Sequence, residues 1–235
     1  METEQNLLPL LRRCPLFEGL SEEALRDRVL PRGTLRRCSK NAALITPGET
    51  VDWFAVAAAG RVQIMQLFAD GTGSLMDALG PGQVLGAELL CTRSRRAPYY
   101  AIAAGEVQIL RFPGSLLLEE DGGLTDGDRA AVWRALLTLL AQENMRRHYR
   151  IAILSRRGLR DRVLTWLTMQ ARRRQSRTFR APFSREELAA FLCVNRSALS
   201  HELSRMEAEG LIRFRKNEFT LLSAGESQSA WSTLE

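Results

Sequence analysis

The chain has 235 residues, of which 45% are hydrophobic and 26% are charged, and this composition excludes a disordered chain, a collagen and a disulfide-rich miniprotein. The net charge is +6, yet residues 141–235 carry 18 Lys and Arg against 10 Asp and Glu, while residues 1–140 carry 15 against 17. A positive surplus at one end indicates that this end contacts a polyanion, although an Arg-rich chain is equally typical of a GC-rich genome.

Neither a membrane span nor a secretory signal is expected. Apolar runs are only a few residues long, and the stretch from Met1 to Gln5 carries two acids where a signal peptide would carry bases. The four cysteines are scattered without a C-x-x-C pair, which argues against a zinc or iron–sulfur site. We therefore expect a cytoplasmic protein with reduced thiols and no metal.

Residues 5–30 are expected to form short helices. Leucines recur from Leu7 to Leu11, Pro15 breaks the first helix, and Ser21 is a good N-terminal cap for the next one.

A β-roll is expected from about Ala42 to Phe112. Short apolar stretches alternate here with turns at Pro47-Gly48-Glu49, Gly60-Arg61, Asp70-Gly71 and Gly80-Pro81-Gly82. Fourteen of the 17 glycines precede residue 128, and this spacing is typical of successive short strands in a barrel or sandwich. The stretches 99–104 and 107–112 predict a last hairpin that closes the roll.

A long helix is predicted over residues 126–154, which contain no Pro and no Gly after Gly127. One stripe along it has the helical spacing of a seam: Leu137, Leu140, Asn144, His148 and Ile151. This stripe favours pairing with a second copy of the helix, and the alternative is packing on its own domain. Residues 155–158 make a plausible hinge to a further helix over 159–174, and the basic stretch 172–177 is either a solvated connector or a DNA contact.

Residues 183–212 carry a helix-turn-helix pattern. Ser184 and Glu187 form a capping box that begins one helix, Cys193-Val194 makes the turn, and Asn195 caps the next helix. That second helix, residues 195–207, has an apolar face of Leu199, Leu203 and Met206.

The other face of the second helix suits a DNA groove. Small hydroxyls allow close approach of the backbone, and Arg can bind guanine through two hydrogen bonds. The expected DNA-binding residues are Arg185, Asn195, Arg196, Ser197, Ser200, His201 and Arg205. Two short apolar strands at 211–214 and 219–222 predict a wing whose tip contacts phosphates. The alternative is a helical pair that binds only proteins.

This order of parts resembles the Crp/Fnr superfamily of bacterial transcription regulators. Its sensor-domain landmarks resemble Leu16-Phe-Glu-Gly-Leu-Ser, Pro47-Gly-Glu, Gly60-Arg-Val, Asp70-Gly-Thr and Leu79-Gly-Pro-Gly-Gln-Val-Leu-Gly, and its DNA-reading domain resembles 183–212. The resemblance implies that Arg196, Ser197 and His201 occupy the three base-contacting positions. Many members have Glu and Arg in place of Ser197 and His201, so a different operator half-site is expected; Cys193 stands where glycine is frequent.

The implied effector site departs from the family pattern. Members that bind a cyclic nucleotide have Gly-Glu-Leu, then Arg-Ser-Ala, and a Thr-Ser pair on the long helix, whereas this chain has Gly86-Ala87-Glu88-Leu89, then Arg95-Arg96-Ala97, and no such pair. The candidate pocket residues are Gly86, Glu88, Arg95, Arg96, Arg147 and His148. A cyclic nucleotide, another small anion and no ligand all remain open. The oxygen-sensing cysteine cluster is absent, haem is disfavoured, and the cofactor is unknown.

These observations predict an α+β chain with an N-terminal β-roll of the cyclic-nucleotide-binding type, a long central helix and a C-terminal winged helix-turn-helix. The expected domains are 1–125 for sensing, 126–156 for dimerisation and hinge, and 157–235 for DNA binding. The expected function is that of a homodimeric regulator, not an enzyme, which reads an inverted repeat on double-stranded DNA under a small-molecule or redox signal. The resemblance implies contact with RNA polymerase. The alternatives are a cupin-like ligand-binding protein and a partner-binding sensor with a vestigial DNA domain.

Overall fold

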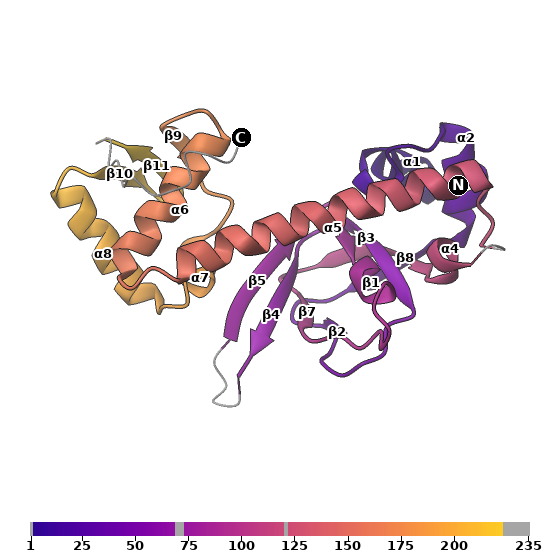
Figure 1. Cartoon of the computed structure of the whole chain (residues 1–235), viewed down its shortest axis with the longest axis horizontal. Coiled ribbons are helices and arrows are strands. Elements are labelled where there is room, and N and C mark those ends of the chain that lie inside the picture. Colours follow the sequence, from indigo (N-terminus) through magenta and orange to yellow (C-terminus); the bar gives the residue numbers. More distant parts are fainter. Residues whose placement is uncertain (1, 69–72, 120–121, 223–235) are drawn as a thin grey trace. The chain divides into compact units, whose positions relative to one another are not determined.

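The computed structural model describes residues 2–68, 73–119 and 122–222 (Figure 1). Contacts between residues divide it into two compact units, Met1–Met145 and Arg146–Glu235. The division falls inside helix α5 (Asp126–Leu154), so this helix contributes to both units. The turn expected at Asp70-Gly71 lies outside the described residues.

Short helices open the first unit, as predicted. Helix α1 (Glu2–Arg13) is followed by a 3₁₀ turn (Pro15–Phe17) and by α2 (Glu22–Ala24), which continues through a π turn (Leu25–Val29) and a second 3₁₀ turn (Leu30–Arg32). The predicted cap at Ser21 is confirmed, because its Oγ accepts a hydrogen bond of 3.1 Å from the backbone N–H of Ala24.

The predicted β-roll is confirmed as two antiparallel four-stranded sheets. One sheet has the order β1 (Thr34–Cys38), β8 (Val107–Pro113), β3 (Trp53–Ala59) and β6 (Val84–Leu85). The other has the order β2 (Ala43–Ile45), β7 (Tyr100–Ala103), β4 (Val62–Leu67) and β5 (Gly73–Leu79). Short helices α3 (Ala87–Leu90) and α4 (Ser115–Leu118) complete the unit.

Strand β3 is buried on both faces because each face meets a different partner. Phe54 and Val56 pack into a core with the N-terminal helices and with α5, which contributes Val132. Trp53 and Ala55 point to the opposite face, into a second core that both sheets share. The alternation of side chains along an extended strand separates the two cores.

The hairpin predicted over residues 99–112 is wrong. Strand β7 pairs with β2 and β4, whereas β8 pairs with β1 and β3, so these two consecutive strands lie in different sheets. The apolar pattern correctly indicated two strands but carries no information on which strand pairs with which. Strand β1 was not predicted, because Thr34–Cys38 contains two arginines and lacks an apolar run.

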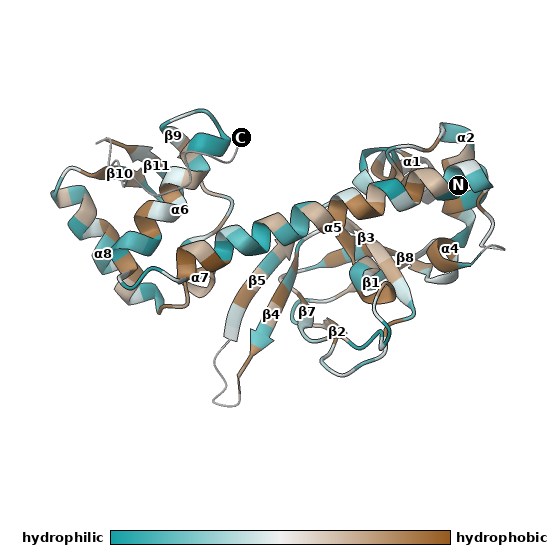
Figure 2. Cartoon of the chain, viewed as in Figure 1, coloured by the Kyte–Doolittle hydropathy of each residue, from teal (hydrophilic) through white to brown (hydrophobic). Residues whose placement is uncertain are grey.

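The long helix is confirmed as α5, with bounds at Asp126 and Leu154. Val132 and Leu136 are buried in the first unit, and Ile153 is buried in the second. Hydrophobic and hydrophilic residues are mixed along the helix, and residues 142–150 are mostly hydrophilic (Figure 2). Leu137 and Ile151, both in the predicted seam, are 62% and 65% exposed.

The second unit continues with α6 (Leu159–Arg173), β9 (Thr178–Arg180), α7 (Arg185–Phe191), α8 (Arg196–Ala208), β10 (Ile212–Arg215) and β11 (Glu218–Leu221). Its three strands pair in the order β10-β11-β9. The predicted wing strands are confirmed as β10 and β11; strand β9 was not predicted. Trp166 is buried at the centre of this unit, where it meets Phe219 edge to face with ring centroids 6.2 Å apart.

Candidate nucleic-acid interface

Helix α7 begins with the capping box that the sequence predicts. The Ser184 hydroxyl accepts a hydrogen bond of 3.2 Å from the backbone N–H of Glu187, and the Glu187 carboxylate accepts one of 2.7 Å from the backbone N–H of Ser184. Two backbone donors that the helix leaves unpaired are thereby satisfied. The capping box fixes where the first helix of the pair starts.

The turn between α7 and α8 is tight. Cys193 has φ of 57°, in the left-handed region, and Val194 donates its backbone N–H to the Ala189 carbonyl at 3.0 Å. Asn195 then caps α8, because its Oδ1 accepts hydrogen bonds from the Ala198 backbone at 2.7 Å and from the Ser197 hydroxyl at 2.8 Å. The Asn195 side chain therefore stabilises the N-terminal end of helix α8.

Helix α8 has one fully buried face and one exposed face. Leu199, Leu203 and Met206 are 0% exposed and pack in the core of the second unit. The exposed face carries most of the residues expected to bind DNA; Arg196, Ser197, His201 and Arg205 are exposed, and Ser200 is half-buried. The helix bounds agree with the predicted recognition helix.

Arg185 joins the start of α7 to the tip of the wing. Its Nη2 donates a hydrogen bond of 3.0 Å to the carbonyl of Lys216, and its guanidinium lies 4.9 Å from the centre of the Phe214 ring. Burial, and secondarily the positive charge of Arg196, lower the pKa of Arg185. The predicted DNA residue Arg185 thus also anchors the wing.

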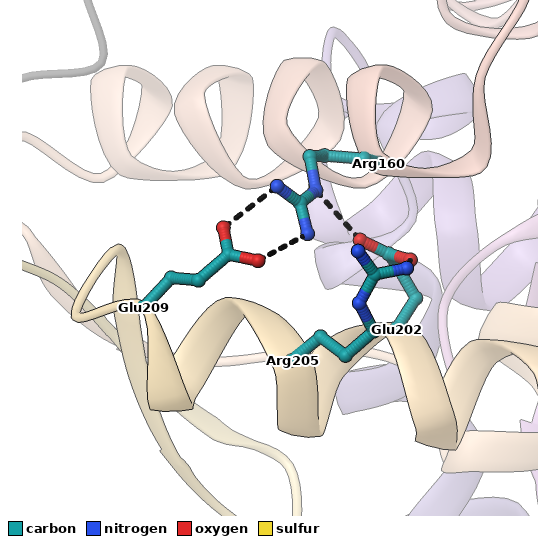
Figure 3. Close-up of polar contacts among 4 residues, drawn as sticks. All are labelled: Arg160, Glu202, Arg205 and Glu209. Carbon is teal, nitrogen blue, oxygen red and sulfur yellow. Dashed lines mark hydrogen bonds and ion pairs between the residues drawn. The ribbon is translucent and has the colours of Figure 1, made fainter.

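Arg160 of α6 anchors α8 through two carboxylates (Figure 3). Its Nε donates to Glu202 at 2.7 Å, while Nη1 and Nη2 donate to the two oxygens of Glu209 at 2.7 and 2.8 Å. Glu202 also lies 3.8 Å from Arg205 on its own helix. Sequence reasoning missed this network, although the spacing of Glu202 and Glu209 by two helical turns places both on one face.

Two further arginines hold the end of α7. Arg150, buried near the end of α5, donates to the Phe191 carbonyl at 3.4 Å and stacks 4.9 Å from the Phe191 ring. Arg162 of α6 donates to the Leu192 carbonyl at 3.3 Å. Helix ends expose unpaired carbonyls that carry partial negative charge, so these two cations stabilise the turn.

The structure places the predicted effector loop around helix α3. Gly86 precedes this helix with φ of 83°, and the carboxylate of Glu88 accepts a hydrogen bond from the hydroxyl of buried Tyr99. Arg95 and Arg96 are exposed. The Arg95 carbonyl accepts a hydrogen bond of 2.9 Å from the Val51 backbone, which fixes the loop to the roll.

The remaining candidates lie on α5. Arg147 and His148 are exposed and belong to the second unit, so the structure describes them separately from the loop at Gly86. In the seam, Leu140 is half-buried against the first core, whereas Asn144 is exposed. The described ranges contain no cluster of metal-ligating side chains, and none of their helices is long and apolar enough to cross a membrane.

Two family models match the chain. Residues 35–120 match the cyclic nucleotide-binding domain, and residues 161–225 match the Crp-like helix-turn-helix domain. Together these two ranges span more than half of the chain. No curated protein matches the chain significantly.

Solved structures of the same architecture are similar in fold. The c-di-GMP responsive global regulator CLP of Xanthomonas campestris matches with a TM-score of 0.67 and 17% identity, over 84% of this chain and 97% of that one. CooA of Carboxydothermus hydrogenoformans, solved as a mutant, matches with a TM-score of 0.65 and 18% identity, over 86% and 90%. FixK2 of Bradyrhizobium japonicum matches with a TM-score of 0.60 and 20% identity, over 81% and 93%.

The fold and the interface define a transcription regulator with a β-roll of the cyclic-nucleotide-binding type and a DNA-binding winged helix-turn-helix. The order of the two domains in this chain and the two family matches are both typical of one superfamily. The chain belongs to the Crp/Fnr superfamily of bacterial transcription regulators.

Proposed function

We propose that the protein is a homodimer that reads an inverted-repeat operator through α8, in response to a small molecule bound at the β-roll. The observation that carries this proposal is the division of α8 into a face that is 0% exposed at Leu199, Leu203 and Met206 and a polar face that is free for DNA. When one face of a helix is packed in the core, the side chains on the opposite face are held at defined positions.

Arg196 and His201 are the proposed base readers. Both are exposed on α8, one turn and a fraction apart, so they reach neighbouring base pairs in the major groove. Arg213, Arg215 and Lys216 of the wing are exposed and supply phosphate contacts beside the groove. Arg185 reaches the same backbone from the start of α7.

The proposed dimer forms along α5. Five large hydrophobic residues of this helix are exposed in the single chain: Trp133, Leu137, Met145, Tyr149 and Ile151. A second copy of the helix would remove this apolar surface from water. Two recognition helices related by twofold symmetry would then read half-sites about one DNA turn apart.

Two of the three cysteines in the first unit are poorly suited to a redox signal. A redox-sensing cysteine needs a thiolate, but burial raises the pKa of Cys14 to about 11. Burial, and secondarily the negative charge of Glu88, also raise the pKa of Cys91. The exposed cations Arg95 and Arg96 instead suit an anionic effector at the loop that begins at Gly86.

Selection of fragmented genomic DNA by the purified protein at near-physiological salt tests the function. We expect sequencing of the retained fragments to show an enriched inverted repeat. A second selection with added cell extract supplies the effector if the free protein is inactive. Purely salt-sensitive, sequence-independent retention in both selections would contradict the proposal.

Replacing Arg196 tests the assignment of the base reader. We expect Arg196→Ala to weaken binding to the selected operator by about 1 to 3 kcal/mol and to change binding to unrelated DNA far less. The measurement is fluorescence anisotropy with both DNAs at one salt concentration. Arg134→Ala, which removes an exposed cation from α5, serves as the control and should bind as the unaltered protein does. An equal loss on both DNAs would make Arg196 a phosphate contact.

A further inference from the structure

A hollow of about 350 Å³ lies on the first unit, and none of its lining residues belongs to the loop at Gly86–Arg96. Strands β1, β3 and β8 of one sheet form most of its wall. Its lining residues are Arg32, Thr34, Arg36, Asp52, Trp53, Arg111, Phe112 and Pro113. Three of these side chains are cations and one is an anion, so the hollow carries an excess of positive charge.

The strand register explains why these side chains converge. Thr34 of β1 lies directly opposite Arg111 of β8, and Arg111 lies opposite Ala55 of β3. Directly opposed residues share one face of a sheet, and so do residues two apart on a strand. Arg36 and Trp53 therefore lie on the same face as Arg111, whereas Arg37 lies on the other face.

Arg111 is held in place within the hollow. Its guanidinium lies 4.4 Å from the centre of the Trp53 ring, and its Nη2 is 3.9 Å from Asp52. The guanidinium of Arg32 lies flat against Gly123, where a Cβ atom would come within 2.5 Å of Arg32 Nη2. Stacking and close backbone contact orient both cations before any ligand arrives.

Two of the three cations lack a counter-charge. Within the residues that the structure describes, Arg32 and Arg36 form no ion pair and no side-chain hydrogen bond. Asp52 is 78% exposed and stands nearest to Arg111, so it balances one charge of three. A group of guanidinium forks around one space has the donor geometry that phosphate oxygens accept.

We propose that this hollow binds a small phosphate-bearing anion. Its volume suits a small ligand, and its charge requires an anion. This hollow shares no lining residue with the effector loop, and it adds an anion input to the first unit.

Titration of the full-length protein with pyrophosphate tests the site. Trp53 forms its wall, so we expect the Trp53 indole N–H signal to shift in a saturable way in nitrogen–proton NMR spectra, with Trp53→Phe used for assignment. Calorimetry gives the affinity. Arg36→Ala should weaken the Trp53-reported affinity about tenfold, since one charge-assisted contact is lost.

Arg37→Ala is the matched control, because it removes the same charge from the same strand on the opposite face. We expect it to leave the affinity reported by Trp53 unchanged. An equal loss in both variants, or pyrophosphate binding without any shift of the Trp53 signal, would overturn the proposal. Operator selection with Arg36→Ala separates this site from the proposed function, because α8 is unaltered in this variant.

Discussion

Arg160 links helix α6 to helix α8 through side-chain hydrogen bonds. It donates three hydrogen bonds to Glu202 and Glu209, at the middle and the end of the recognition helix. Bidentate pairing with Glu209 fixes orientation as well as distance, which a single Lys contact would not do.

Removing the Arg160 guanidinium should destabilise the second unit. We expect Arg160→Met, which keeps the apolar part of the side chain, to lower the midpoint of thermal unfolding and to weaken operator binding. Arg157→Met, which removes an exposed cation just before the same helix, is the control. Circular dichroism and anisotropy measure the two effects, and identical curves for both variants would argue against the anchoring role.

The same pair predicts a pH dependence. Hydrogen bonds from Arg160 lower the pKa of Glu209 below its ordinary value of about 4.5. A lowered pKa in the folded state adds stability that is present above pH 4.5 and is lost as the pH falls through the folded-state pKa. Urea unfolding in steps below pH 5 should therefore show a steeper loss for the unaltered protein than for Arg160→Met. Parallel curves would contradict this account.

At the scale of single elements, the start of α7 rests on its capping box. Ser184→Ala removes one half of it and should cost about 1 kcal/mol of unfolding free energy, whereas Ser184→Asp should recover most of the loss. Ser204→Ala, on the exposed face of α8, provides the comparison and should be nearly neutral. Urea denaturation at pH 7 measures all three variants.

Local sequence signals predicted the helices better than the sheets. The caps at Ser21, Ser184 and Asn195 involve residues three apart, so they were readable from the sequence and are confirmed. Strand partners are distant: β8 pairs with β1, which begins at Thr34, and no short-range pattern encodes that choice. Strand β9 is three residues long, too short for a periodic signal.

In the candidate site, too, local features were predicted from the sequence and distant contacts were not. The exposed face of α8 follows from helical periodicity, which assigned Arg196 to the exposed side and Leu199 to the core. Contacts that depend on tertiary packing were missed, such as Arg150 on the Phe191 carbonyl and Arg160 on Glu209. An Arg-rich sequence does not reveal which arginines are structural, because the acceptors lie far along the chain.

At the scale of the whole molecule, the exposed hydrophobic residues of α5 predict that the protein is a dimer. Leu137→Glu and Ile151→Glu place charges at positions that are 62% and 65% exposed in the single chain, so they should leave the fold of each chain intact. We expect each variant to sediment as a monomer and to lose operator affinity at low concentration. Thr138→Glu, beside the stripe, is the control. A variant that still sediments as a dimer would refute the proposed interface.

Arg150 of α5 and Arg162 of α6 both contact the end of α7, and these contacts do not depend on the loop between α5 and α6. Arg150 donates a hydrogen bond to the Phe191 carbonyl. Arg162 donates hydrogen bonds to the Leu192 carbonyl and to the carbonyl of Arg156 in the loop. The hydrogen bond to the Arg156 carbonyl restrains the loop between α5 and α6. We expect torsion of the last turns of α5 to reach α7 through the contact of Arg150 with the Phe191 carbonyl as well as through the connecting loop.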